Sequence, residues 1–233
     1  NPSTITTSSL TTASELRQIG AVMHSTPVLV TNQGKISYDT TNKKITSTNR
    51  KDFVLFGTTQ GLLHVVDAET GQEKFAFVPN EMVERQKEAF LTSTATSGGM
   101  NNLFYGVDGA WTLHTEYVLD DSGNLTVGER TSSSIKGKQL AVGCLRMGGR
   151  GYYGLDLSNI DSPALKFNIN PTDASTSCSN SNPLACMGQS WSKPNLGYVS
   201  WGGKRTLVMF VGGGYGAGYE SATYDQTDRR AGE

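Results

Sequence analysis

The sequence predicts an all-β fold, a β-propeller built of four-stranded antiparallel blades. Short apolar runs alternate with turns centred on glycine, a pattern typical of strands in a meander. Residues 54–79 hold three such runs and two tight turns. The pattern returns further along the chain, and copies of one supersecondary unit indicate a repeat architecture.

Residues 24–79 predict the first blade. Its first strand follows Pro27 near the strand start, where a missing N–H is tolerated. In the turn after the third strand, Asp67 can accept N–H groups two or three residues on, and Gly71 can adopt a positive φ. The polar residues 31–51 predict a solvent-facing hairpin inserted between blade strands.

Residues 80–104 predict a helical insert. Glu81 to Leu91 contains good helix formers, and Asn80 stands where an N-cap residue would lie. We expect a short helix packed across the edge of the propeller.

Residues 105–170 predict a second blade, because their runs can be matched to those of the first. The matching segments are 139–143, 151–157 and 165–169 against 54–57, 61–67 and 74–78. Residues 191–233 open a third copy, but the second half of that blade is missing. The repeat exceeds the ~40–50 residues of a usual blade because of its polar inserts.

A closed propeller needs at least about four blades, and this chain predicts about two and a half. We therefore expect the front part of a ring from a longer protein, with residues 1–18 as a flexible Ser/Thr-rich segment before it. An open half-ring exposes strand edges and blade faces, so residues 1–233 expressed alone are expected to aggregate or stay partly unfolded.

Composition and charge exclude some classes of partner. The formal net charge of −1 gives no reason to expect binding to nucleic acid. No apolar run approaches the ~20 residues of a transmembrane helix. The chain also starts without a basic and apolar leader, so any signal peptide is expected to be absent from this sequence.

The three cysteines point to an oxidising compartment. Cys178 and Cys186 bracket a polar loop within residues 171–190 that cannot order itself by burial, which favours a disulfide between them. A zinc site is the weaker alternative, because the spacing is wide and no histidine lies nearby. Cys144 lies in an apolar run and is expected to be a buried free thiol.

Candidate metal and catalytic residues are few. Asp120, Asp121 and Asn124 are the nearest approach to a calcium loop, but they lack the alternation and distal glutamate of one, so a hairpin turn is favoured. His64 lies within a strand and is expected to hydrogen-bond between neighbouring strands or blades. His24 and His114 have no triad spacing. Catalysis by these groups is therefore not expected.

The remaining motifs have structural interpretations. The glycine clusters at 148–151 and 212–218 fit no phosphate-binding loop and predict tight turns and close strand packing. Arg150 is expected to pair with Asp108 or Asp156, and the alternative is a place on a ligand-facing surface. The tryptophans are expected to pack between blades; they are Trp111, Trp191 and Trp201.

These motifs, taken in order over residues ~19–219, resemble the PilC/PilY-type family of type IV pilus proteins. The segments that carry the likeness include His24-Ser-Thr-Pro27, 57–79, 105–109, 148–156 and 191–194. The motif positions, which we expect to be structural, are His24, Pro27, Gly61, His64, Asp67, Gly71, Pro79, Asp108, Gly109, Gly151, Asp156 and Pro194. Residues 109–111 and 144–147 depart from the family pattern.

The resemblance implies a C-terminal propeller of an exported protein, located in the periplasm, at the outer membrane or at the cell surface on the pilus tip. It implies a non-enzymatic factor in pilus biogenesis, adhesion and twitching motility, with minor pilins or a host-surface ligand as partners. No cofactor is expected here, although calcium can be bound outside this stretch.

Two alternatives share the propeller but not the function. One is a quinoprotein-type periplasmic dehydrogenase, because the turn beginning at Asp67 also resembles blades of that class. The other is an outer-membrane assembly scaffold, which would be expected to have regular ~40-residue repeats and few inserts.

Overall fold

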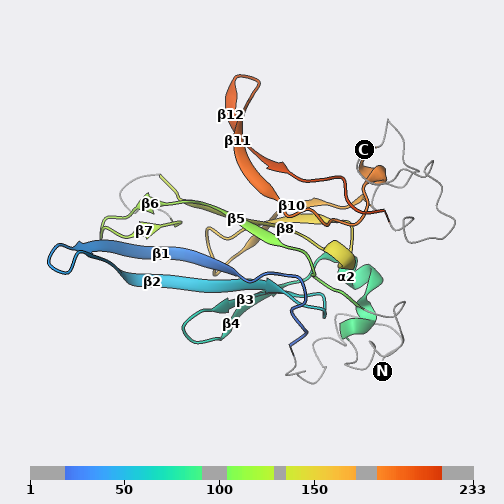
Figure 1. Ribbon diagram of the computed structural model, residues 1–233, viewed down its shortest axis with the longest axis horizontal. Coiled ribbons are helices and arrows are strands. Elements are labelled where there is room, and N and C mark those ends of the chain that lie inside the picture. The colour runs from blue at the N-terminus through green and yellow to red at the C-terminus, as the bar shows by residue number, and fades with distance from the viewer. Residues whose placement is uncertain (1–18, 91–103, 129–134, 172–182, 217–233) are drawn as a thin grey trace.

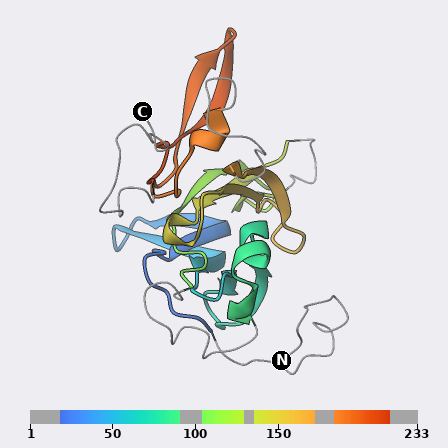
Figure 2. The same ribbon diagram turned by 90° about the vertical axis from the view of Figure 1, so that its right-hand side faces the viewer.

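The computed structural model describes residues 19–90, 104–128, 135–171 and 183–216. Its strands form three antiparallel sheets, and the two larger ones are stacked face to face with the third beside them (Figures 1 and 2). The predicted all-β, antiparallel fold is confirmed. No helix in these residue ranges is long and apolar enough to cross a membrane.

The first sheet has six strands in the order β4-β3-β2-β1-β7-β6. Their bounds are β1 (Val28–Asp39), β2 (Lys44–Gly57), β3 (Leu63–Asp67), β4 (Glu73–Phe77), β6 (Val118–Leu119) and β7 (Leu125–Thr126). Four of the strands come from the stretch predicted as the first blade. The short β6–β7 hairpin comes from further along the chain and pairs with β1 at Gln33 and Gly34.

Strand periodicity decides which face of this sheet is buried. Val30, Leu55 and Val65 are fully buried, and cross-strand pairing places Leu55 beside Val65. Their alternating neighbours lie on the opposite face, since successive side chains in a strand point to opposite sides. His64, between Leu63 and Val65, is one of these neighbours.

The turn between β3 and β4 has the predicted mechanism. The Asp67 carboxylate accepts hydrogen bonds from the N–H groups of Glu69 (3.0 Å) and Thr70 (2.8 Å), and Gly71 has φ +72°. Hydrogen bonds from Thr70 are the main reason that the pKa of Asp67 is lowered. The charged carboxylate is therefore the form that stabilises the turn.

Replacing Asp67 by alanine is expected to lower the midpoint of thermal unfolding at neutral pH. Because the pKa of Asp67 is lower in the folded chain, its stabilisation is present above the unfolded pKa of about 4 and is lost as the pH falls further. The difference in midpoint between wild type and Asp67→Ala should thus shrink in acid. Glu69→Ala, at an exposed neighbouring position, is the matched control, and an equal effect of both variants would contradict the mechanism.

The hairpin expected at 31–51 exists, but it is not a separate insertion. β1 and β2 pair continuously from Val28 opposite Leu55 to Asp39 opposite Lys44, with register shifts between Thr31 and Lys35. The polar residues therefore extend two blade strands outward, beyond the core.

The predicted helix is shorter than expected. Helix α2 (Asn80–Arg85) is followed by a 3-10 turn, η1 (Lys87–Phe90), and Pro79 rather than Asn80 is the N-cap residue, without a side-chain cap bond. The helix ends at Arg85, and the C-cap residue Gln86 leaves the helical conformation with φ −125°. The Gln86 side chain bonds to two distant segments. Its amide donates to the Gly148 carbonyl (2.8 Å) and accepts from the Gly106 N–H (2.9 Å).

The second sheet is four-stranded, in the order β10-β9-β8-β5. Its strands are β5 (Trp111–Glu116), β8 (Lys138–Cys144), β9 (Tyr152–Asp156) and β10 (Ala164–Ile169), with a 3-10 turn, η3 (Arg146–Gly148), between β8 and β9. The strands follow one another in space as β1 to β4 do in the first sheet. Trp111 is buried and covers Gly143, where a Cβ would lie 2.0 Å from the indole ring.

The third sheet is a hairpin of β11 (Asn195–Trp201) and β12 (Lys204–Phe210), preceded by a 3-10 turn, η5 (Pro183–Cys186). Within the described residues this sheet has two strands, and residues 217–233 lie outside the described part of the chain. Trp201 stands next to the hairpin turn with 75% of its surface exposed, so the expectation that it packs between blades is wrong for this chain. Trp191 is partly exposed, and only Trp111 is buried.

Candidate functional site

A group of side chains joins the three sheets where their first strands begin. His24 precedes β1, Asp108 precedes β5, Trp191 precedes β11, and Arg146 follows β8. We call these four residues the junction cluster.

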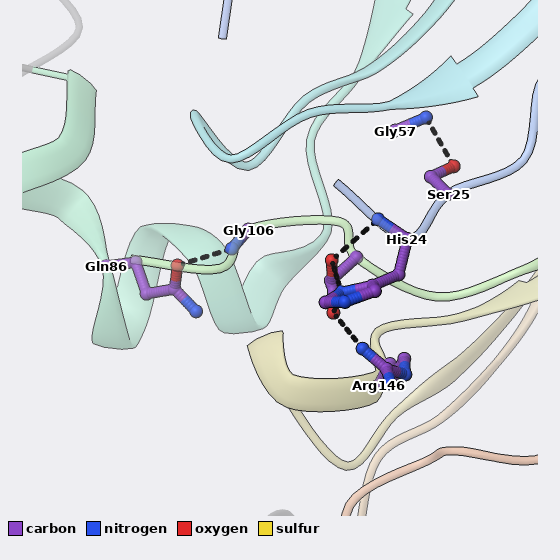
Figure 3. Close-up of polar contacts among 7 residues, drawn as sticks. His24, Ser25, Gly57, Gln86, Gly106 and Arg146 are labelled. Carbon is purple, nitrogen blue, oxygen red and sulfur yellow. Dashed lines mark hydrogen bonds and ion pairs between the residues drawn. The ribbon is translucent and has the colours of Figure 1, made fainter. Parts of the chain in front are cut away.

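Asp108 is the centre of the junction cluster. Its side chain is fully buried. The carboxylate accepts hydrogen bonds from the backbone N–H of His24 (3.2 Å) and from the His24 ring at Nδ1 (2.9 Å). It also accepts one from the Arg146 guanidinium (3.2 Å), and Figure 3 marks the contacts of His24 and Arg146 with dashed lines. The buried charge is thereby paired and hydrogen-bonded, as burial requires.

Arg146 extends the junction cluster to the third sheet. It has φ +51°, in the left-handed region that non-glycine residues rarely adopt. Its guanidinium lies 4.3 Å from the centre of the Trp191 ring, a cation–π contact. The pairing expected of Arg150 is therefore made by Arg146, whereas the Arg150 guanidinium donates to the carbonyls of Ala185 and Met187.

Two buried serines hold the same region. The Ser25 hydroxyl accepts the Gly57 N–H (2.8 Å; Figure 3). The Ser190 hydroxyl accepts the Leu145 N–H (3.0 Å) and lies 3.0 Å from the Gly151 carbonyl, to which it can donate. Because each hydroxyl is engaged with the backbone, neither is placed as a nucleophile with a neighbouring base.

The glycine cluster at 148–151 receives a carboxylate from the chain itself. Glu81, in α2, is fully buried and accepts hydrogen bonds from the N–H groups of Arg150 (3.2 Å) and Gly151 (2.8 Å). A Cβ at Gly149 or Gly151 would lie within 2.8 Å of the Glu81 carboxylate. These glycines therefore admit Glu81, and the arrangement fixes the helical insert to the second sheet.

The calcium candidates form a hairpin turn between β6 and β7. The Asp120 carboxylate accepts the N–H groups of Ser122 (2.9 Å) and Asn124 (2.7 Å) and the Asn124 side-chain amide (2.9 Å). Gly123 supplies φ +77°. These bonds within the turn lower the pKa of Asp120. Asp121 lies in the same turn and is exposed. Across the described ranges, no group of three or more His, Cys, Asp or Glu side chains could hold a metal ion.

The other two histidines bond within or between sheets. His64 lies 2.6 Å from the Glu73 carboxylate on the adjacent strand and 3.3 Å from the Thr58 hydroxyl. His114 lies 2.9 Å from the Glu116 carboxylate, and the Tyr198 hydroxyl of β11 donates to the same carboxylate. The His64 contact joins β3 to β4, and the His114 contact lies within β5, which Tyr198 links to β11. The Thr58 hydroxyl near His64 is buried and can donate to the Leu62 carbonyl (3.3 Å), which favours a structural role.

Cys144 is a buried free thiol. Burial raises its pKa to about 11, against a reference value of 9.0. Cys186 lies in η5 and Cys178 lies outside the described residues, so the disulfide between them stays a prediction.

Cys144 is expected to react slowly with a thiol reagent at pH 8 while the protein is folded, and quickly after unfolding in urea. The buried neutral thiol stabilises the fold below its reference pKa of 9.0, and this contribution is lost as the pH rises toward 11. Mass spectrometry of the peptide that contains Cys144 measures the labelling. Equal rates in the folded and unfolded protein would contradict this burial.

The remaining motif positions serve turns and close packing. Gly61 has φ +89° and lies against Met82, and a Cβ at Gly109 would lie 2.2 Å from the Cys144 carbonyl oxygen. Asp156 ends β9 and accepts the Ser158 N–H (3.0 Å). The three prolines among the motif positions each directly precede a strand or helix. Pro27 precedes β1, Pro79 precedes α2 and Pro194 precedes β11.

One hydrogen-bonded link between the first and second sheets could not be predicted from the sequence. The buried Asn32 amide donates to the buried Gln139 side chain (2.7 Å), which in turn donates to the Thr31 carbonyl (3.1 Å). In the sequence, Asn32 and Gln139 are visible only as polar residues within strand segments. A polar residue facing solvent would give the same pattern.

Comparisons with known proteins agree with this architecture. The family model for the PilY1 β-propeller domain matches residues 18–229. The chain is 25% identical over 232 residues to the type IV pilus biogenesis factor PilY1 of Pseudomonas aeruginosa, covering 92% of this chain and 16% of that protein. It is 27% identical over 166 residues to a PilY1 homolog of Xylella fastidiosa, covering 71% of this chain and 11% of that one.

A solved structure is also similar. The crystal structure of the Pseudomonas aeruginosa PilY1 C-terminal domain aligns with a TM-score of 0.45 and 23% identity, over 72% of this chain and 25% of that one. The chain therefore spans a small part of the relatives it matches. Since the family model covers nearly all of its residues, the chain belongs to the PilY1 β-propeller domain family.

Proposed function

We propose that this chain is a propeller module of an exported type IV pilus biogenesis factor and acts there by binding, without catalysing a reaction. The observation that carries the proposal is the family match over residues 18–229. The partners we propose are minor pilins or a surface ligand at the pilus tip. Adhesion and twitching motility would follow from assembly of the pilus.

Two features of the chain support a binding role. The sheets share a buried core that includes Leu55, Leu63, Trp111 and Tyr153, while the outer part of β1 and β2 is solvent-exposed. Exposed excursions on a rigid scaffold are where binding usually occurs. The polar groups of the junction cluster are engaged with one another, which favours a structural role over a catalytic one.

Cells that carry this protein provide the test. Removing residues 19–216 from the chromosomal gene should abolish surface pili, counted by electron microscopy, while the major pilin is still produced. Restoring the wild-type gene should restore the count. Normal piliation in the deleted strain, with the remaining protein exported at its usual level, would contradict the proposal.

A further inference from the structure

The outer part of β1 and β2, residues 34–48, has an apolar face without a core beneath it. We call this segment the ribbon, and Figure 1 shows it projecting past the other strands. Ile36 is 62% exposed, Tyr38 60% and Ile45 73%. Tyr38 pairs with Ile45 and Ile36 with Ser47, so the three apolar side chains share one face.

The other face of the ribbon is polar. It carries Lys35, Ser37 and Asp39 on β1 and their partners Lys44, Thr46 and Thr48 on β2. A ribbon that is only solvated has no need of an apolar face, and exposed apolar patches rimmed by polar residues mark interaction sites.

The edge of β1 beside this patch already accepts a strand from a distant part of the chain. β7 pairs with β1 at Gln33 and Gly34, and the turn that precedes β7 ends beside Lys35, whose ammonium group donates to the Ser122 carbonyl (3.2 Å). Beyond this point, the described residues place no strand against the β1 edge from 36 to 39. An extended peptide can continue the sheet there through main-chain hydrogen bonds.

A small pocket lies where the ribbon meets the β6–β7 hairpin. It has a volume of about 110 Å³, and its lining includes Gly34, Ile36, Tyr117 and Leu125. Side-chain pockets beside an open strand edge give specificity to added strands. The mostly apolar wall suits one aliphatic side chain of an incoming strand.

The charge of the ribbon indicates the sign of the charge on its partner. It holds three lysines, Lys35, Lys43 and Lys44, and one acidic residue, Asp39. The Asp39 carboxylate accepts the N–H groups of Thr41 (2.9 Å) and Asn42 (3.0 Å) within the hairpin turn. The lysines therefore give the ribbon a positive field that attracts acidic side chains.

We propose that the ribbon docks an extended, acidic segment of a partner protein, which adds as a strand to the β1 edge and lays alternate apolar side chains beside Ile36 and Tyr38, whose apolar face Ile45 continues on β2. This inference rests on the binding role proposed above and names the site and the chemistry of the partner. Its test uses the purified protein and no pili, so that the two proposals can fail separately.

The probe is a fluorescein-labelled peptide of alternating valine and glutamate, titrated with the full protein that carries this chain and followed by fluorescence anisotropy. We expect saturable binding. The same peptide with alternate residues N-methylated keeps its side chains but loses ladder hydrogen bonds, and should bind at least about tenfold more weakly. The double variant Ile36→Thr/Tyr38→Thr, which changes the two apolar residues on β1, should weaken binding to a similar extent.

Leu165→Thr is the matched control, because Leu165 is an exposed apolar residue on another outer strand, β10. It should leave the affinity unchanged, and circular dichroism checks the fold of each variant. Equal affinity for the two peptides, or equal loss in the control variant, would overturn the proposal. So would binding to phosphatidylglycerol vesicles without peptide binding, or a self-association that the double variant abolishes, because these outcomes identify a membrane or a second copy as the occupant.

Discussion

Replacing Asp108 by alanine is expected to lower the free energy of unfolding by about 3 kcal/mol, because the substitution leaves Arg146 without its buried partner. The variant also removes the acceptor of the His24 N–H and ring bonds. Arg146 is itself only partly exposed, so water replaces the lost carboxylate incompletely. The positive φ of Arg146 adds to the loss, since a strained backbone persists only while its surroundings hold it.

Urea unfolding followed by tryptophan fluorescence measures this effect, since Trp111 and Trp191 lie in the region concerned. Asp108→Asn keeps an acceptor oxygen and should be intermediate between wild type and Asp108→Ala. His24→Ala should cost less than Asp108→Ala, because the pair between Asp108 and Arg146 remains. A stability of Asp108→Ala within about 0.5 kcal/mol of wild type, the range of ordinary surface substitutions, would show that the junction cluster does not hold the sheets together.

Replacing Glu81 by alanine is expected to destabilise the protein by about 2–3 kcal/mol and to free the helical insert from the second sheet. The substitution leaves the N–H groups of Arg150 and Gly151 without their acceptor in a buried site, and each unsatisfied group costs about 1–3 kcal/mol. Packing of α2 on Gly149 is lost as well.

Limited proteolysis and urea unfolding together test this expectation. Glu84→Ala is the control, since Glu84 lies in the same helix but is exposed. Glu81→Gln keeps one acceptor oxygen and should retain part of the stability. Faster cleavage after Arg85 in Glu81→Ala, but not in Glu84→Ala, would be consistent with the account, whereas unchanged cleavage and stability in both variants would refute it.

Features that depend on neighbouring residues were predictable from the sequence. The turn from Asp67 to Gly71 is an example, since its hydrogen bonds and its positive φ are set within five residues. Another example is that Leu63 and Val65 share one face of β3 while His64 lies on the other. The two-residue period of a strand alone determines which side chains share a face.

Features that depend on distant segments were not predictable. The addition of β7 to β1 joins residues that lie far apart in sequence, and no local pattern announces it. Arg146 and Arg150 lie four residues apart, and no local pattern shows that Arg146, which has φ +51°, is the one that donates to Asp108. The short α2 is another example, because the residue at its end, Gln86, bonds to the distant Gly148 and Gly106, and helix propensity takes no account of such contacts.

We propose that this chain belongs to a binding module of the type IV pilus assembly machinery. The most direct test is size-exclusion chromatography of the full propeller protein mixed with purified minor pilins, with and without calcium. We expect co-elution as a stable complex, and a calcium requirement would show that the interaction depends on a bound ion. Separate elution under both conditions, together with a quinone chromophore in the absorbance spectrum of the purified protein, would contradict a binding role in pilus assembly and favour a dehydrogenase.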